Sequence, residues 1–185
     1  MKASRIVRIP ASLFLVICLA ACGDSPTSGD ESIGTNPPGG VVVGDPVPAV
    51  LDMTECKDYS TGIPMVSTSP YMDCMEYSYV GGNVLYLKHI NAAFNCCPVV
   101  DWDIRVEGNT ITIEEIELEG QCLCLCLYDI DYEIQNLSAG TYQLVVIEPH
   151  RSPDDPVLEF TMDLVSSPSG RHCVHRTSYP WGFIW

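Results

Sequence analysis

Three cysteines at every second position, Cys122, Cys124 and Cys126, open the segment "QCLCLCLYDIDYEI" at residues 121–134. Cysteine can form disulfides, bind soft metal ions as a thiolate, or fill a core as a free thiol. The chain after residue 50 holds five more cysteines: Cys56, Cys74, Cys96, Cys97 and Cys173. An even number favours disulfides in an exported chain, whereas in a cytosolic chain it would indicate a metal site. The choice therefore depends on the compartment.

Strand spacing limits which of these cysteines can pair. Side chains two apart on an extended strand face the same way, but their Cα atoms lie about 6.6 Å apart, at the upper edge of disulfide geometry. We therefore expect Cys122, Cys124 and Cys126 to be bridged to other segments. Cys96 or Cys97 should supply at least one partner. Eight cysteines allow on the order of 100 connectivities, and spacing alone does not select one.

A metal site is the alternative use of the same cluster. Its thiolates would best match zinc or Cu(I). The candidate ligands are Cys96, Cys97, Cys122, Cys124 and Cys126, with His89, His172 or His175 as a nitrogen donor. A regular strand spreads three such thiolates too widely for one ion, so we favour disulfides and expect no cofactor.

The N-terminus indicates export. Residues 1–21 hold no acidic residue, and three basic residues precede an apolar run at 11–20. This is the pattern of a signal peptide, and the run is shorter than the roughly 20 apolar residues that cross a bilayer. The run ends in Leu19-Ala20-Ala21-Cys22, which resembles the lipobox of bacterial lipoproteins. The resemblance implies that Cys22 becomes the lipidated N-terminus of a cell-envelope protein.

The sequence after Cys22 predicts where the lipid holds the protein. Asp24 does not directly follow Cys22, so the outer membrane is expected rather than the inner one. Loss of residues 1–21 would remove three of nine basic and none of 24 acidic residues, and would take the net charge from -15 to -18. Such a chain repels phosphate groups, which excludes nucleic acid as a partner and leaves the lipid as the link to the membrane.

Composition divides the mature chain into a tether and one domain. Residues 22–50 are rich in Gly, Pro, Ser and Asp and lack aromatic residues, which is typical of a disordered acidic tether. Residues 51–185 suffice for a single cysteine-rich domain with its own core.

Period-two patterning recurs through residues 51–185 and predicts an all-β domain. Apolar residues alternate from Trp102 to Val106, and Gly108-Asn109 supplies a hairpin turn. In the returning strand the apolar positions shift from Ile111 and Ile113 to Ile116 and Leu118, so we expect a β-bulge near Glu114 and Glu115. Seven or so short strands suit a two-sheet antiparallel sandwich.

The cysteine segment should itself be one long strand. Even positions from Cys122 to Ile134 would face the core, and the leucines at 123, 125 and 127 suggest that its first half is covered on both sides. The following stretch, "DYEIQNLSAGTYQLVV", looks like the strand, turn and strand near the end of many immunoglobulin-like domains.

Two further stretches bear on the role of the domain. "LKHINAAFNCCPV", the cysteine segment and "RHCVHRTSYPWG" resemble, over residues 74–182, a cysteine-rich family of bacterial envelope proteins of unassigned function, which implies no catalytic residue. The tail places aromatic side chains at period two: Tyr179, Trp181, Phe183 and Trp185. They are candidates for binding a glycan or protein partner, although core packing in a closing strand is favoured because large aromatics rarely stay exposed in numbers.

The motifs G-x-S-x-G, H-E-x-x-H, G-x-G-x-x-G and the P-loop are absent from the sequence. We therefore predict a non-catalytic, lipid-anchored envelope protein that acts as a binding or structural module stapled by disulfides. A metal-binding lipoprotein that uses the cysteine cluster is the alternative, and a hydrolase with an unfamiliar site is a third.

Overall fold

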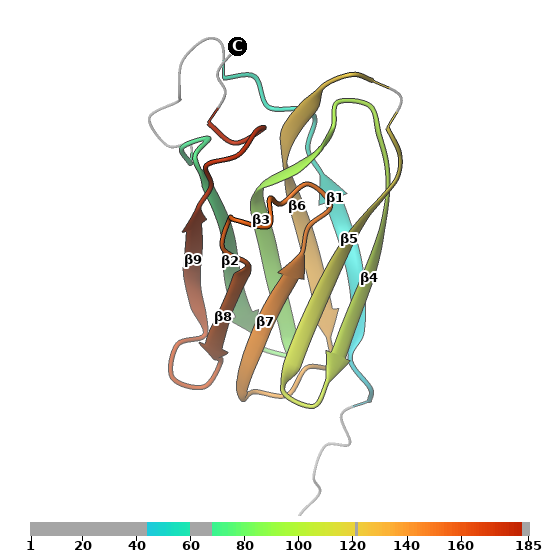
Figure 1. Ribbon diagram of the computed structural model, residues 1–185. Helices are drawn as coiled ribbons and strands as arrows, with labels where there is room; N and C mark the ends of the chain where they lie inside the picture. Colours follow the sequence, from blue (N-terminus) through green and yellow to red (C-terminus); the bar gives the residue numbers. More distant parts are fainter. Residues whose placement is uncertain (1–43, 60–67, 121, 183–185) are drawn as a thin grey trace, which may run out of the picture. The chain divides into compact units, whose positions relative to one another are not determined.

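The computed structural model describes residues 44–59, 68–120 and 122–182, and within them it forms nine strands and no helix (Figure 1). The predicted signal peptide, Cys22 and most of the predicted tether lie outside these residues. No helix in the described part is long and apolar enough to span a bilayer. The described residues belong to one compact unit, Val41–Trp185.

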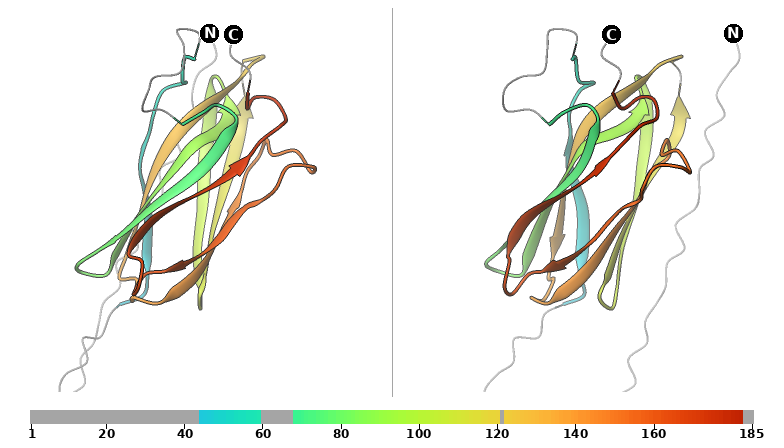
Figure 2. Two further views of the ribbon diagram at one scale, coloured as in Figure 1. Left: turned by 90° about the vertical axis from the view of Figure 1, so that its left-hand side faces the viewer. Right: turned by 60° about the vertical axis from the view of Figure 1, so that its left-hand side comes forward.

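The strands form two sheets that face each other (Figures 1 and 2). The five-stranded sheet has the order β1 (Val47–Met53), β6 (Leu125–Gln135), β3 (Val84–Asn95), β2 (Met72–Val80) and β9 (Ser169–His175). The four-stranded sheet has the order β4 (Pro98–Glu107), β5 (Thr110–Gly120), β7 (Thr141–Ile147) and β8 (Leu158–Asp163). The all-β, two-sheet prediction is thereby confirmed.

The core lies between the sheets because strand side chains alternate between two faces. Its fully buried members include Leu87, Phe94, Ile113, Tyr132 and Leu144. A second, smaller cluster lies on the opposite side of β3 and β6 and contains Tyr59, Ala93, Leu127 and Trp181. The upper part of these two strands is therefore buried on both faces.

One strand pair departs from the expected antiparallel order. β5 and β7 run parallel, with Ile111 opposite Leu144 and Ile113 opposite Val146. Between them the chain crosses to the other sheet as β6 and returns. Two reversals restore the original direction, so neighbours separated by one strand of the opposite sheet are parallel.

The cysteine segment is shorter as a strand than predicted. β6 begins at Leu125, so Cys122 and Cys124 precede it, and Leu123 is fully exposed rather than covered. From Cys126 onward the even positions are buried, as expected. Pairing with β3 ends at Asn95 opposite Leu125, where β3 turns away toward β4, so no strand remains to extend the ladder.

The predicted bulge at Glu114 and Glu115 is wrong. The inward face of β5 continues through Glu115, which is 3 % exposed, and the register shifts further along, opposite Val99 and Val100. The sequence interpretation assumed that a glutamate must face solvent. Glu115 faces inward because two core side chains donate hydrogen bonds to it.

The domain starts earlier than the composition suggested. Residues 47–50, assigned to the tether, belong to β1, which pairs with β6 from Val47 opposite Gln135. Pro48 is tolerated because β1 is an edge strand of its sheet.

Candidate functional site

All eight cysteines of the domain pair in the structure. The bridges are Cys56–Cys126, Cys74–Cys173, Cys96–Cys124 and Cys97–Cys122. No two of Cys122, Cys124 and Cys126 pair with each other, and Cys96 and Cys97 supply two of their partners. Three of the Cα–Cα separations are 5.6 Å, within the usual range for disulfides, and the fourth is 4.0 Å for Cys74 and Cys173, which lie directly opposite each other on β2 and β9. The expected pairing between segments is therefore found.

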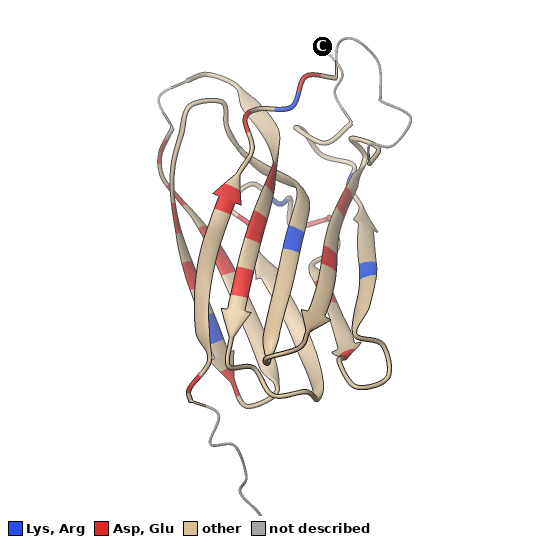
Figure 3. Ribbon diagram, turned by 180° about the vertical axis from the view of Figure 1, so that it is seen from behind, with Lys and Arg blue, Asp and Glu red and all other residues tan. Residues whose placement is uncertain are grey.

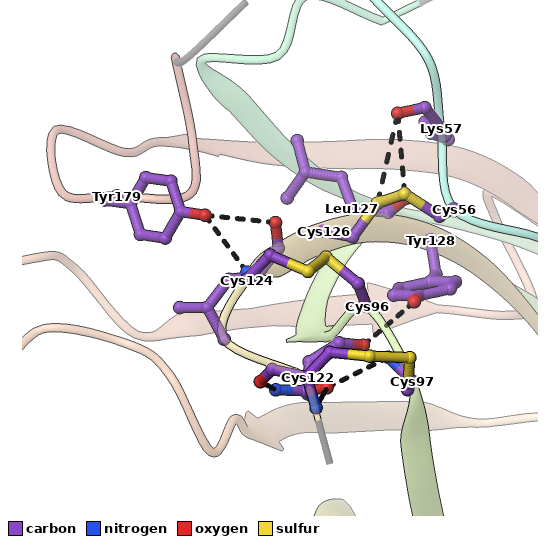
Figure 4. The surroundings of a disulfide bond; sticks show 12 residues. Cys56, Lys57, Cys96, Cys97, Cys122, Cys124, Cys126, Leu127, Tyr128 and Tyr179 are labelled. Carbon is purple, nitrogen blue, oxygen red and sulfur yellow. Dashed lines mark hydrogen bonds between the residues drawn. A yellow bond between two sulfur atoms is a disulfide. The ribbon is translucent and has the colours of Figure 1, made fainter. Parts of the chain in front are cut away.

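Three bridges gather at one end of the sandwich, where β3 passes to β4 and the chain enters β6 (Figure 4). Asn95 organises this end. Its Oδ1 accepts the Cys97 N–H at 2.9 Å, its Nδ2 donates to the Cys122 carbonyl, and its own carbonyl accepts the Tyr128 hydroxyl at 2.9 Å. With their sulfurs bonded to each other, these cysteines offer no thiolate to a metal ion, which is the arrangement of the favoured disulfides and not that of the alternative metal site.

The histidines lie away from the disulfide cluster. His172 stacks on Phe160 with ring centroids 4.8 Å apart, and His175 stacks on Tyr71 at 6.1 Å. His89 is fully buried between carboxylates. Its Nε2 lies 2.7 Å from Asp73 Oδ1, and its Nδ1 lies 2.6 Å from Glu115 Oε1. Because both neighbours are acceptors, both ring nitrogens donate, which requires the imidazolium form.

Arg176 completes this buried network. It donates to the carboxylates of Asp73 and Glu148 and to the Pro156 carbonyl, and it is 0 % exposed. Tyr132 donates its hydroxyl to Glu115 Oε1 at 2.7 Å. We call Asp73, His89, Glu115, Glu148 and Arg176 the buried ionic cluster. It joins β2 and β3 of one sheet to β5 and the segment after β7 of the other.

The cluster holds two cations and three carboxyl groups, and the pKa directions indicate how charge balances. Burial alone would lower the pKa of His89, but Glu115 and Asp73 outweigh it and hold that pKa well above its usual value. Burial and the Asp73 carboxylate raise the pKa of Glu148 well above its usual value. The pKa of Asp73 is lowered while that of Glu148 is raised, so of these two carboxyl groups Asp73 is the one whose ionised form the surroundings favour.

The same groups have the geometry of a metal site. Asp73, His89 and Glu148 each offer one ligand atom, and these atoms lie within 4.8 Å of one another. Arg176 donates to both carboxylates, so the chain itself supplies positive charge at this point. Asp73, His89 and Arg176 are 0 % exposed, and a substrate cannot touch them unless the core opens. The arrangement links the two sheets across the core.

The aromatic tail is not a binding strand in its described part. Residues 178–182 form turns, Trp181 is 1 % exposed, and its Nε1 donates to the Asn91 carbonyl at 2.9 Å. Tyr179 is half-buried and bonded through its hydroxyl to the backbone of Leu125. As candidates for a binding stripe, both are corrected to packing residues. Phe183 and Trp185 lie outside the described residues.

The outer face of the five-stranded sheet carries a row of charges that runs across all five strands (Figure 3). In register, the row consists of Asp52, Asp131, Lys88, Glu76 and Arg171. Lys88 Nζ lies 3.2 Å from Asp131 Oδ2, and Arg171 Nη1 lies 3.4 Å from Glu76 Oε1. The neighbouring row on β3, β2 and β9 is Tyr86, Ser78 and Ser169.

These two rows line a shallow cavity of about 540 Å³, which we call the charged furrow. Tyr86 is 39 % exposed beside it. Tyr77 lies against Gly170, where an added Cβ would come within 2.7 Å of the tyrosine ring. A glycine is therefore needed at 170 for the ring to cross β9 at this point.

Sequence reasoning missed the buried ionic cluster and the furrow. Glu115 occupied a position at which the alternation of β5 called for an apolar residue, and that exception was the available signal. No such signal came from the other members of the cluster, because they are distant from one another in the sequence: Asp73, Glu148 and Arg176. Comparison with known protein families, with curated proteins and with solved structures finds no match to this chain.

Proposed function

We propose that the protein is a lipid-anchored, non-catalytic binding module of the cell envelope, and that the charged furrow binds a neutral glycan. The row of charges across all five strands is the observation that carries this proposal. Four bridges and the buried ionic cluster make the sheet beneath it a rigid platform. Rigid platforms hold polar groups in place at a small entropic cost of binding.

The chemistry of the furrow supports a glycan. Carboxylates accept and Lys88 and Arg171 donate hydrogen bonds, so hydroxyl groups along a sugar chain meet alternating partners. Tyr86 offers a partly exposed ring for an apolar sugar face. The two ion pairs lie at side chains 37 to 43 % exposed, where such pairs contribute only about 0 to 1 kcal/mol to stability. The contribution of these ion pairs to the stability of the fold is therefore too small to explain the row of charges.

The immunoglobulin-like relationship and the family resemblance are part of the same proposal. Tyr142 donates its hydroxyl to the Ser138 carbonyl at 2.9 Å across the turn between β6 and β7. This contact resembles the tyrosine corner of immunoglobulin-like sandwiches. The parallel pair β5 and β7 departs from their antiparallel sheets.

Titration with neutral envelope oligosaccharides tests the furrow, with amide NMR shifts as the readout. We expect shifts on β3, β2 and β9, and about tenfold weaker binding for Tyr86→Ala and for the Lys88→Ala/Asp131→Ala pair. Arg105→Ala is the matched control, because Arg105 pairs with Glu114 on the outer face of the other sheet. The proposed ligand would be contradicted if Arg105→Ala weakened glycan binding as much as the furrow variants do. It would also be contradicted if the furrow bound a protein and no glycan.

Membrane fractionation tests the anchor. Cys22→Ser should release the processed protein or leave its signal peptide uncleaved, because the serine hydroxyl cannot take the lipid thioether. Processing and membrane retention identical to the unmodified chain would show that Cys22 is no anchor.

A further inference from the structure

Lys57 lies between an amide and a carboxylate at the upper end of the five-stranded sheet. Its Nζ is 2.6 Å from Asn91 Oδ1 and 2.5 Å from Asp129 Oδ1. The three residues come from the segment after β1, from β3 and from β6. The Lys57 amine thus contacts both a carboxamide and a carboxylate, and these are the groups needed to form an amide bond between two side chains.

The Asn91 side chain is fixed at all of its polar atoms. Its Nδ2 donates to the carbonyls of Ser69 and Met72 at 3.0 and 2.6 Å, and its Oδ1 accepts the Tyr59 hydroxyl at 2.7 Å. Asn91 is 0 % exposed and has a φ of 71° at the register shift of β3. Asparagine tolerates this left-handed conformation better than most residues. The carboxamide is thus held in one orientation toward Lys57.

The surroundings favour reaction over a simple ion pair. Tyr59, Ala93, Leu127 and Trp181 form the apolar cluster next to these groups. Burial lowers the pKa of Lys57, partly offset by Asp129, and so favours the neutral, nucleophilic amine. Burial also raises the pKa of Tyr59 to about 12, so its hydroxyl stays protonated and continues to donate to Asn91 Oδ1.

We propose that Lys57 and Asn91 form an intramolecular isopeptide bond, with Asp129 as the proton-transfer group. Asp129 takes a proton from Lys57 Nζ, and the nitrogen lone pair attacks Asn91 Cγ. Negative charge develops on Oδ1, toward which the Tyr59 hydroxyl already points. The Cγ–Nδ2 bond then breaks, and Nδ2 leaves with protons delivered through Asp129.

The step balances without any other reactant. An ammonium group and a carboxamide become a secondary amide and an ammonium ion, so one C–N bond forms and one breaks, with no oxidation. A cavity of about 410 Å³, lined by Lys57 and Tyr59, adjoins the site and gives the ammonia a way out. The new bond would tie the segment after β1 to β3, across the intervening β6, beside the Cys56–Cys126 bridge.

Mass spectrometry of the full chain, after reduction and alkylation of all cysteines, tests the bond directly. We expect a mass about 17 Da below that calculated for the same processed form, through loss of ammonia. Trypsin should fail to cleave after Lys57, and the peptide ending at Lys88 should remain joined to peptide 89–105, which contains Asn91. Fragmentation of the joined peptide should locate the bond between Lys57 and Asn91.

Two variants serve as controls. Lys57→Arg keeps the positive charge without the nucleophile, and Asp129→Asn removes the proton-transfer group; both should show the full calculated mass and release peptide 89–105. Their four disulfides, counted by alkylation without reduction, show that they fold. A reduced wild-type chain at its full mass and cleaved after Lys57 would overturn the proposal. So would loss of ammonia without joined peptides, because that result identifies a succinimide at Asn91.

Discussion

His89 on β3 donates Nδ1–H to Glu115 Oε1 on β5 at 2.6 Å, and this hydrogen bond crosses the core from one sheet to the other. Both side chains lie among apolar neighbours. Asp73 binds the other ring nitrogen of His89, and Tyr132 donates to the same Oε1 of Glu115, whereas Glu115 Oε2 has no hydrogen-bond partner among the described residues. An apolar pair in this place would also hold the two sheets together, but it would not select one alignment of the sheets over another. A charged pair is costly when misaligned, so it favours one alignment of the two sheets.

The buried ionic cluster makes stability depend on pH. The pKa of His89 is raised in the folded state, so between the unfolded value near 6.5 and the raised value the folded chain holds one more proton. The contribution of His89 to the free energy of unfolding should therefore be full below pH 6.5 and fall by roughly 1 kcal/mol per pH unit above it. Urea denaturation from pH 6 to 9 measures the slope. His89→Gln should be less stable at pH 6 and show a flatter slope.

Ring-nitrogen NMR gives a second reading that does not depend on how well the variant folds. The His89 imidazole should still carry both protons at pH 8. A neutral His89 ring at that pH would contradict the assigned charge.

Replacement of the carboxyl group by its amide should affect stability much less at Glu148 than at Asp73. The pKa of Glu148 is raised by burial and by Asp73, so Glu148→Gln mimics the protonated carboxyl group that this shift favours and should change stability by less than about 1 kcal/mol at pH 7. Burial opposes ionisation of Asp73, but His89 outweighs it and lowers that pKa. Asp73→Asn should cost about 3 to 5 kcal/mol, because it leaves His89 and Arg176 short of a charge. Equal effects in thermal denaturation would refute this assignment.

Trp181 should act as a core residue of the smaller apolar cluster. Trp181→Ala should lower the free energy of unfolding by about 3 to 5 kcal/mol through lost packing. Trp181→Phe keeps most of the ring but loses the hydrogen bond to the Asn91 carbonyl, and should cost about 1 to 3 kcal/mol. Wild-type melting temperatures for both variants would instead place the ring on the surface.

The disulfide pairs make a prediction for each single cysteine variant. Unreduced wild-type protein should take up no alkylating label in residues 51–185. Cys97→Ser should expose Cys122 to labelling, and Cys96→Ser should expose Cys124, because each loses its own partner. Peptide mapping reads the labelled site. A label on Cys124 in Cys97→Ser would mean that the two neighbouring pairs are exchanged.

Loss of the bridges should destabilise the domain according to the loops they close. Cys97–Cys122 joins residues 25 apart and Cys74–Cys173 residues 99 apart, which the chain-entropy model equates with about 3 and 5 kcal/mol. The Cys74→Ala/Cys173→Ala pair should therefore lower the denaturation midpoint more than Cys97→Ala/Cys122→Ala. The reverse order would show that the chain-entropy term does not dominate here.

Local patterns in the sequence determined the all-β character of this protein. They predicted the hairpin from Trp102 to Ile113, the inward face from Cys126 to Ile134, and bridges from Cys122, Cys124 and Cys126 to other segments. These predictions depend on strand geometry. Side chains along a strand alternate between two faces, and the Cα atoms of residues i and i+2 lie too far apart for an easy disulfide. The lipid anchor at Cys22 remains a prediction from its motif.

The tertiary structure decided what depends on contacts between distant segments. Polarity placed Glu115 in solvent, but a partner 26 residues away, His89, holds it in the core. The period of the tail favoured a strand, but burial of Trp181 against Ala93 and Leu127 fixed it as a turn. Alternation alone could not find Lys57 beside Asn91 and Asp129, because three strands must first pair to bring these groups together. The sequence specifies each strand's faces, whereas the partners that neutralise a buried charge exist only once the two sheets have closed.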